Sequence, residues 1–312
     1  MVLLRRKTVL AVKLETTYGT DPTPGAANCV QVKNLDITPL AGGTVSRDLI
    51  RPFLGNSPQL LAQKFVQAKF TVELAGSGTA GTAPRYGDAL KATGLTETLV
   101  TSTSATYSAT PGTTISSVTI YYNIDGLLHK ITGARGTVSL KADLNQIPEL
   151  QFDFTGIYNA PSDTAAISPT YANQASPLVF RAGNTSAFQF FSYAGALQSV
   201  SFDLANTVIY RELIGGTAQA LITDRKPAGN VSIEAIAIAT KDYFAAALAD
   251  GTTGSLTFQH GTTAGNIATL TIPYADITQP AYGEQDGVTT LNIPYVAIPS
   301  TAGSDEFTLA FT

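Results

Sequence analysis

A short peptide occurs twice in this chain. The tetrapeptide Arg-Asp-Leu-Ile at residues 47–50 returns as Arg-Glu-Leu-Ile at residues 211–214. One such match could arise by chance. However, each copy occupies the same place in a longer series of matching segments, and self-similarity in a preserved order indicates duplication. The sequence therefore predicts a diverged tandem repeat, which restricts the fold to two related halves.

The other matches lie on both sides of the tetrapeptide and keep their order along the chain. In chain order the pairs are 35–37 with 202–204, 59–61 with 219–221, Glu73 with Glu234, Tyr86 with Tyr243, Gly94 with Gly251, and 150–155 with 307–312. The number of residues that separates matching positions falls gradually along the chain, as deletions in the loops of the second half would cause. We therefore expect the two halves to share one order of elements.

Alternating apolar and polar residues dominate both halves. Residues 66–74 place apolar side chains on one side and polar side chains on the other, the pattern of a half-buried strand. Residues 118–124 repeat the pattern, and Asp125-Gly126 predicts a hairpin turn into residues 127–132. Residues 8–14 form a possible further strand. The chain is therefore predicted to be mainly β.

One short helix is predicted in each half, at 84–93 and 241–250. The first has Pro84 near its start and Gly94 as a left-handed stop. The second has Thr240 as its N-cap residue and Gly251 as its stop. Each half then consists of strands, a helix and further strands, which favours a β-barrel or sandwich with a helix on its side.

These patterns give a domain plan with four parts. We expect an N-terminal arm at 1–25, a first domain at 26–158, a linker at 159–185 and a second domain at 186–312. The linker prediction depends on prolines and turn residues with little periodicity. With 312 residues the chain has room for two domains of ordinary size.

The composition points away from several functions. Charged residues make up 13% of the chain, about half the usual share, and surfaces so poor in charge are often buried in assemblies. The net charge of −4 argues against binding nucleic acid through its phosphates. The one cysteine, Cys29, excludes an internal disulfide framework.

No export or membrane segment is predicted. The apolar residues 1–4 precede Arg5-Arg6-Lys7, which reverses the order of a signal peptide. The apolar run at 243–249 is too short to cross a bilayer. We therefore expect a protein that is made and kept soluble in a cytoplasm, or assembled from one.

Residues for catalysis or for metal and cofactor binding are not predicted. The two histidines, His129 and His260, are isolated from any nucleophile motif, and we expect surface or interface positions for them. Metal-ligating residues do not cluster. The glycine-rich segment at 76–81 lacks the Lys-Ser/Thr of a phosphate loop, so we interpret it as a flexible loop. We expect the chain not to be an enzyme.

Four groups of segments stand out together: 11–20, Arg47 with 51–55, 73–78 before Ala83-Pro84, and 133–136 before 150–158. Together they resemble the tail tube proteins of tailed phages, the major tail subunits of long non-contractile tails. The resemblance implies a β-barrel with a flanking helix that forms rings, and rings that stack into a tube for DNA. It also implies a location in the virion tail after assembly in the bacterial host cytoplasm.

The resemblance further implies partners. These are other copies of the chain, the tape measure protein and later the genomic DNA in the lumen, and the tail terminator and distal tail proteins. Because each chain holds two halves, three chains would supply six barrels, so we expect a trimeric ring with pseudo-sixfold symmetry. The alternative is a carbohydrate- or receptor-binding β-sandwich of a virion or cell surface, suggested by loops rich in threonine and tyrosine.

Seven residues are candidates for the assembly interface. The pairs Arg47-Asp48 and Arg211-Glu212 stand in the repeated peptide, and their alternative role is a salt bridge that fixes a loop. Tyr18 lies in the arm and Gly76 and Gly78 lie in the glycine-rich loop, which we expect to contact a neighbouring ring.

Overall fold

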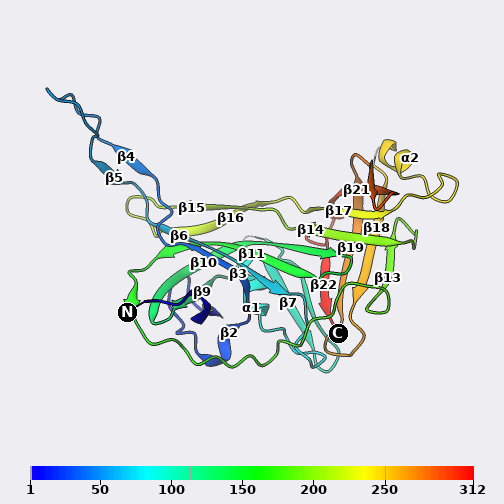
Figure 1. Ribbon diagram of the computed structural model, residues 1–312, viewed down its shortest axis with the longest axis horizontal. Helices are drawn as coiled ribbons and strands as arrows, with labels where there is room; N and C mark the ends of the chain where they lie inside the picture. Colours follow the sequence, from blue (N-terminus) through cyan, green and yellow to red (C-terminus); the bar gives the residue numbers. More distant parts are fainter. Residues whose placement is uncertain (1, 113, 250) are drawn as a thin grey trace.

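The computed structural model describes residues 2–112, 114–249 and 251–312, and these residues form a mainly β protein (Figure 1). Two short helices accompany the strands, α1 (Gly87–Ala92) and α2 (Tyr243–Leu248). The predicted fold class is thus confirmed, and both helices lie inside their predicted ranges. Two 3-10 turns, η1 (Arg5–Lys7) and η2 (Ala26–Asn28), lie near the N-terminus.

The ends of the helices follow from local chemistry. Gly94 has φ of +84°, a left-handed conformation that glycine adopts without steric cost, and the chain leaves α1 there. At α2 the cap is Asp242 rather than Thr240, because the Asp242 carboxylate accepts a hydrogen bond from the N–H of Ala245 at 2.8 Å. Both residue types are favoured caps, so the sequence could not separate them.

The strands of the first half form an antiparallel sheet in the order β2-β1-β9-β10-β11-β6-β3. The turn between β9 and β10 has positive φ at Asp125 and Gly126, as a two-residue hairpin requires. The strands are β1 (Thr8–Leu14), β2 (Cys29–Val30), β3 (Lys33–Thr38), β6 (Phe65–Glu73), β9 (Val118–Ile124), β10 (Leu127–Asp143) and β11 (Glu149–Tyr158).

The second half repeats this arrangement in the order β13-β18-β19-β21-β17-β14, with β20 continuing β19 along β21. The strands are β13 (Thr185–Phe190), β14 (Leu197–Asp203), β17 (Ala228–Glu234), β18 (Thr253–His260), β19 (Ala268–Ile277), β20 (Ala281–Gln285) and β21 (Val288–Ala297). By its partners, β1 corresponds to β13, β3 to β14, β6 to β17, β9 to β18, β10 to β19 with β20, and β11 to β21.

One of the predicted matches between the two halves, that of 307–312 with 150–155, is wrong. Residues 307–312 were matched to the strand at 150–155, yet β22 (Thr308–Phe311) pairs with β19 and with β8 (Ser104–Ala109). The structural counterpart of β11 is β21. Both β11 and β22 alternate apolar and polar residues, and that pattern is common to half-buried strands, so it cannot tell one from another.

The expected barrel closure is not found. Among the described residues, the pairings form an open, branched sheet in which no path of paired strands returns to its starting strand. Two pairings join the halves: β10 with β14, and β22 with β8, which also pairs with β7 (Leu95–Val100). The division into two tandem domains stays a prediction.

The main core is shared by both halves. The ring of Tyr86 in α1 lies 6.5 Å from that of Phe152 and 6.0 Å from that of Phe311. Its hydroxyl donates to the carbonyl of Ala75 at 2.7 Å, which satisfies the one polar group of this buried ring. A helix of the first half is thus held against the last strand of the chain.

The two segments expected to lie outside the domains behave differently. Of the predicted arm at 1–25, residues 8–14 form β1, which pairs on both edges and buries Leu10 and Val12. The predicted linker makes a short pairing through β12 (Ser162–Asp163) and then crosses the surface toward the second half (Figure 1). Its backbone is held by Arg85, whose N–H donates to the carbonyl of Asn173 at 2.8 Å.

Candidate assembly surface

Two hairpins stand outside the main sheet, one in each half, at the same place in the order of strands. Arm 1 (residues 39–64) contains β4 (Thr44–Ser46) and β5 (Gln59–Leu61). Arm 2 (residues 204–227) contains β15 (Asn206–Arg211) and β16 (Gln219–Arg225). The repeated tetrapeptide lies at the turn region of each arm. The repeated tetrapeptide therefore lies in two hairpins that occupy the same place in the order of strands.

Both arms expose apolar side chains at these ends. Ile50 has a relative exposure of 104% and Ile214 one of 109%, so neither touches the rest of its chain appreciably. Arm 1 has the larger set of exposed apolar residues: Leu40, Val45, Leu49, Ile50, Phe53, Leu54, Leu60 and Leu61. Burying an isoleucine side chain is worth about 1.5–3 kcal/mol, and contiguous exposed apolar surface is typical of protein–protein contacts.

Arm 1 extends away from the body of the protein, whereas arm 2 lies along the first-half sheet (Figure 1). Arm 2 is fastened there at Ala220, whose N–H donates to the Tyr18 hydroxyl at 2.7 Å. The carbonyl of Ala220 accepts from Nη1 of Arg135 at 3.0 Å. Further along, the ring of Tyr210 stacks on that of Phe65 at 5.1 Å between centroids. Arm 2 thus reaches the base of arm 1.

A buried carboxylate supports the fastening point. Glu15 is 8% exposed, and its Oε1 accepts from the N–H of Gly133 at 2.7 Å and from the Thr119 hydroxyl at 2.6 Å. Its Oε2 accepts from the N–H of Gly19 at 2.7 Å and from the Ser117 hydroxyl at 2.6 Å. Four donors therefore satisfy the oxygens of one buried carboxyl group and fix the turn that carries Tyr18.

Tyr18 itself is enclosed by this arrangement. Its hydroxyl donates to the carbonyl of Gly133 at 3.0 Å, and the Arg135 guanidinium lies 4.8 Å from the centre of its ring. Burial raises the pKa of Tyr18 above its ordinary value, so the hydroxyl keeps its proton at neutral pH. Tyr18 was predicted as an interface residue, and the structure places it in contacts within the chain.

The remaining candidates fall into two groups. Arg47 and Asp48 lie in arm 1, and Arg211 and Glu212 lie in arm 2. Among the described residues neither pair forms a salt bridge, so the loop-fixing alternative lacks its ion pair. Asp48 instead accepts from the Ser46 hydroxyl at 2.5 Å, within the arm.

The glycine-rich loop contacts the second half of its own chain. The N–H of Gly76 donates to Oδ1 of Asn266 at 2.8 Å, and the N–H of Gly78 donates to the carbonyl of Gly265 at 2.9 Å. A Cβ at Gly76 would lie 2.1 Å from the carbonyl oxygen of Gly265, so only glycine permits this approach. Gly76 and Gly78 therefore hold the halves together. Nothing in the sequence indicates this long-range contact.

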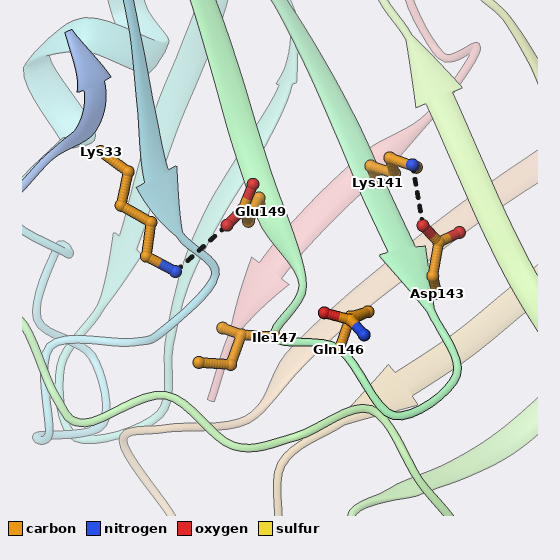
Figure 2. Close-up of a pocket in the computed structure, with 6 residues that line it drawn as sticks. All are labelled: Lys33, Lys141, Asp143, Gln146, Ile147 and Glu149. Carbon is orange, nitrogen blue, oxygen red and sulfur yellow. Dashed lines mark hydrogen bonds and ion pairs between the residues drawn. The ribbon is translucent and has the colours of Figure 1, made fainter.

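A charged hollow of about 380 Å³ lies at one end of the first-half sheet (Figure 2). Its lysines are paired: Nζ of Lys33 lies 2.7 Å from Glu73 and 3.1 Å from Glu149, and Lys141 lies 2.8 Å from Asp143. The hydrogen bond to Glu73 is the main reason that the pKa of Lys33 is raised. A protonated amine paired with two carboxylates, as Lys33 is, is a poor nucleophile or base.

The histidines have structural surroundings. His260 is buried, contrary to the expected surface or interface position; its Nε2 lies 3.1 Å from the carbonyl of Leu178, and its Nδ1 lies 3.0 Å from the Thr185 hydroxyl. Nε2–H therefore donates to the carbonyl, and Nδ1 accepts from the hydroxyl. Burial lowers the pKa of both His260 and His129. Within the described ranges, His, Cys, Asp and Glu side chains form no group of three that could hold a metal.

Cys29 is buried and unpaired in the described part of the chain. Burial raises the pKa of its thiol, which keeps it protonated and unreactive. In the described residues, a helix with the length and apolarity to span a membrane is not found.

A mainly β fold, a shared core and two hairpins with exposed apolar ends give this protein surfaces of the kind found at protein–protein contacts. The chain matches the family model described as phage tail tube protein over residues 5–297, and it belongs to that family. No curated protein matches it. The family is a structural one, and its members form the tube of the virion tail.

Proposed function

We propose that this chain is the major tail tube subunit of a long non-contractile phage tail, and that it polymerises into stacked rings around the DNA channel. The observation that carries the proposal is the pair of arms, because their exposed apolar ends are costly in an isolated protein and useful in a polymer. The family match over 5–297 supplies the class of assembly.

A ring of three chains is the stoichiometry we propose. The strand pairings of the first half recur in the second, so each chain supplies two similar units. Three chains would then give a ring with pseudo-sixfold symmetry, in which every second junction lies within a chain. In this ring the tape measure protein and then DNA occupy the lumen, and the terminator and distal tail proteins bind the ends of the tube.

The charge pattern suits a channel that DNA slides through. On the solvent face of the first-half sheet, Lys69 lies 2.7 Å from Asp153, and Lys33 lies between Glu73 and Glu149. These lysines are therefore neutralised by cross-strand carboxylates. Because each phosphate contact adds salt-dependent affinity, we propose that the lumen wall is neutral or weakly acidic.

The test is to concentrate the purified chain and to image it by negative-stain electron microscopy. We expect hollow tubes of uniform diameter. A chain that stays monomeric at every concentration up to its solubility limit, or that forms only solid fibres, would contradict the proposed function.

A further inference from the structure

The structure contains a junction between its two halves that can serve as a template. The last residues of β10 pair antiparallel with β14, from Ser139 opposite Asp203 to Asp143 opposite Ser199. Directly after this pairing, the chain leaves β14, enters arm 2 and crosses β10 and β11. The junction thus has two parts, a paired edge and an arm that lies over the neighbouring strands.

The same two parts exist a second time, but without partners. By the repeated pairings, β3 corresponds to β14 and β20 corresponds to the end of β10. In the described part of the chain β3 pairs only with β6, and β20 pairs only with β21, so each strand has an open edge. Such edges pair readily with another chain.

The atoms on the open edge of β20 can be identified. Asp286 and Gly287 both have positive φ, so the β20–β21 hairpin has the two-residue turn that makes Gln285 and Val288 a hydrogen-bonded pair. Alternation then turns the N–H groups of Glu284 and Tyr282 away from β21, toward the open edge. On β3, the carbonyl of Leu35 points away from β6 and accepts from Nη2 of Arg5 at 2.9 Å. Pairing with another copy would replace the Arg5 side chain at this oxygen.

Arm 1 differs from arm 2 in exposure at equivalent residues. Ala220 of arm 2 is fully buried against the first-half sheet, whereas Leu60, its counterpart in arm 1, is 56% exposed. The second half exposes apolar side chains where an arm would cross it: Tyr274 on β19 is 40% exposed, and Val296 on β21 is 37% exposed. Among the described residues, no segment covers the exposed apolar side chains of arm 1, and Tyr274 and Val296 offer a partly exposed apolar surface, the landing surface, where a second arm could lie.

The arm and its landing surface cannot meet in one molecule. Arm 1 lies at one end of the longest axis and α2 at the other (Figure 1). The β20 strand is beside α2, because the ring of Tyr282 lies 5.4 Å from that of Phe244. A contact between the two ends is therefore head-to-tail between copies, the arrangement that closes a ring.

We propose that β3 of one copy pairs antiparallel with β20 of the next copy, and that arm 1 of the first lies across β19–β21 of the second. The contact reproduces between chains the junction that β10, β14 and arm 2 make within the chain. It rests on the proposed assembly into rings and specifies its interface.

Proline at Glu284 tests the edge pairing. Proline removes the outward N–H and is tolerated on an open edge, so the Glu284→Pro variant should keep the circular dichroism spectrum and melting temperature of the parent chain. Its critical concentration for tube formation should rise by more than about tenfold, equivalent to a loss of about 1.4 kcal/mol per contact. Glu284→Ala keeps the N–H and is the matched control, expected to assemble normally.

Tyr274→Asp tests the landing surface independently and covers the case in which the proline variant is misfolded. The charged side chain should leave the monomer folded and weaken assembly by a similar factor. If the parent chain forms tubes and both Glu284→Pro and Tyr274→Asp assemble like it, the interface is wrong while the tube function stands. If the parent chain forms no tubes, the proposed function itself fails.

Discussion

The hydroxyl of Tyr18 accepts a hydrogen bond from the N–H of Ala220 at 2.7 Å, although the two residues are 202 positions apart. The contact fastens arm 2 to the turn that follows β1. Arg135 completes it by donating to the carbonyl of Ala220. Arm 2 is therefore an internally docked hairpin, and this makes it a reference for the undocked arm 1.

Tyr18→Phe removes this acceptor and keeps the stacking on Arg135. We expect a loss of about 1–3 kcal/mol in the free energy of unfolding, because the N–H of Ala220 stays buried without a partner. Hydrogen exchange at Ala220 should also become faster. Denaturant unfolding measures the loss. Tyr282→Phe is the control, because Tyr282 is exposed and its hydroxyl makes no hydrogen bond within the described residues.

Glu15→Gln probes the buried carboxylate. A glutamine amide offers one acceptor oxygen where four donors converge, so one buried backbone N–H, of Gly19 or of Gly133, would face an amide NH₂. We expect destabilisation of about 2–3 kcal/mol, measured by thermal unfolding. Glu212→Gln makes the same change at an exposed position of arm 2. Equal melting temperatures for the two variants would contradict this role of Glu15.

His260 should make stability depend on pH. Burial lowers its pKa in the folded protein below the unfolded value of about 6.5, so the unfolded chain binds more protons as the solution is acidified. The stabilisation is present above that value and is lost as the pH falls through the folded pKa. Unfolding free energies at pH 7.5 and 5.5 should differ less in His260→Gln than in the parent chain. The pKa of His129 is also lowered, so part of the pH dependence of stability should persist in His260→Gln. If the pH dependence is the same in His260→Gln as in the parent chain, His260 is not its source.

Ile50→Asp tests whether arm 1 serves in assembly. The side chain is fully exposed, so the melting temperature should stay within the error of measurement. Tube formation, followed by light scattering and electron microscopy, should be strongly reduced because a charge would enter an apolar contact. Val100→Asp places the same charge on an exposed position of β7 and should assemble normally. Tubes of normal length from Ile50→Asp would argue against arm 1 as a contact.

Local patterns predicted much of the fold. Alternation located β6, β9 and β10, and the Asp125-Gly126 turn was found at its residues, because these features depend on neighbouring positions. The repeated tetrapeptide was interpreted as a sign of duplication, and its two copies lie in hairpins at the same place in the order of strands. The sequence could not show that arm 1 projects from the body while arm 2 lies along the sheet, because the exposure of a hairpin depends on whether distant segments cover it.

The long-range contacts made by the candidate site residues could not be predicted from the sequence. Tyr18, Gly76 and Gly78 were selected as residues for contacts between subunits, and each contacts a distant part of its own chain. A tyrosine or a glycine in a turn has the same local signature whether its partner lies in the same chain or in another copy. The match of 307–312 to 150–155 was wrong because strand alternation does not specify a partner strand.

We propose that three chains form each ring of a tube, with one junction within each chain and one between neighbouring chains. Cryo-electron microscopy of assembled tubes, averaged in cross-section and refined without imposed symmetry, tests it most directly. We expect true threefold order, a sixfold-like inner wall and a sheet that continues from β20 of one chain to β3 of the next. Six chains around one ring would contradict it.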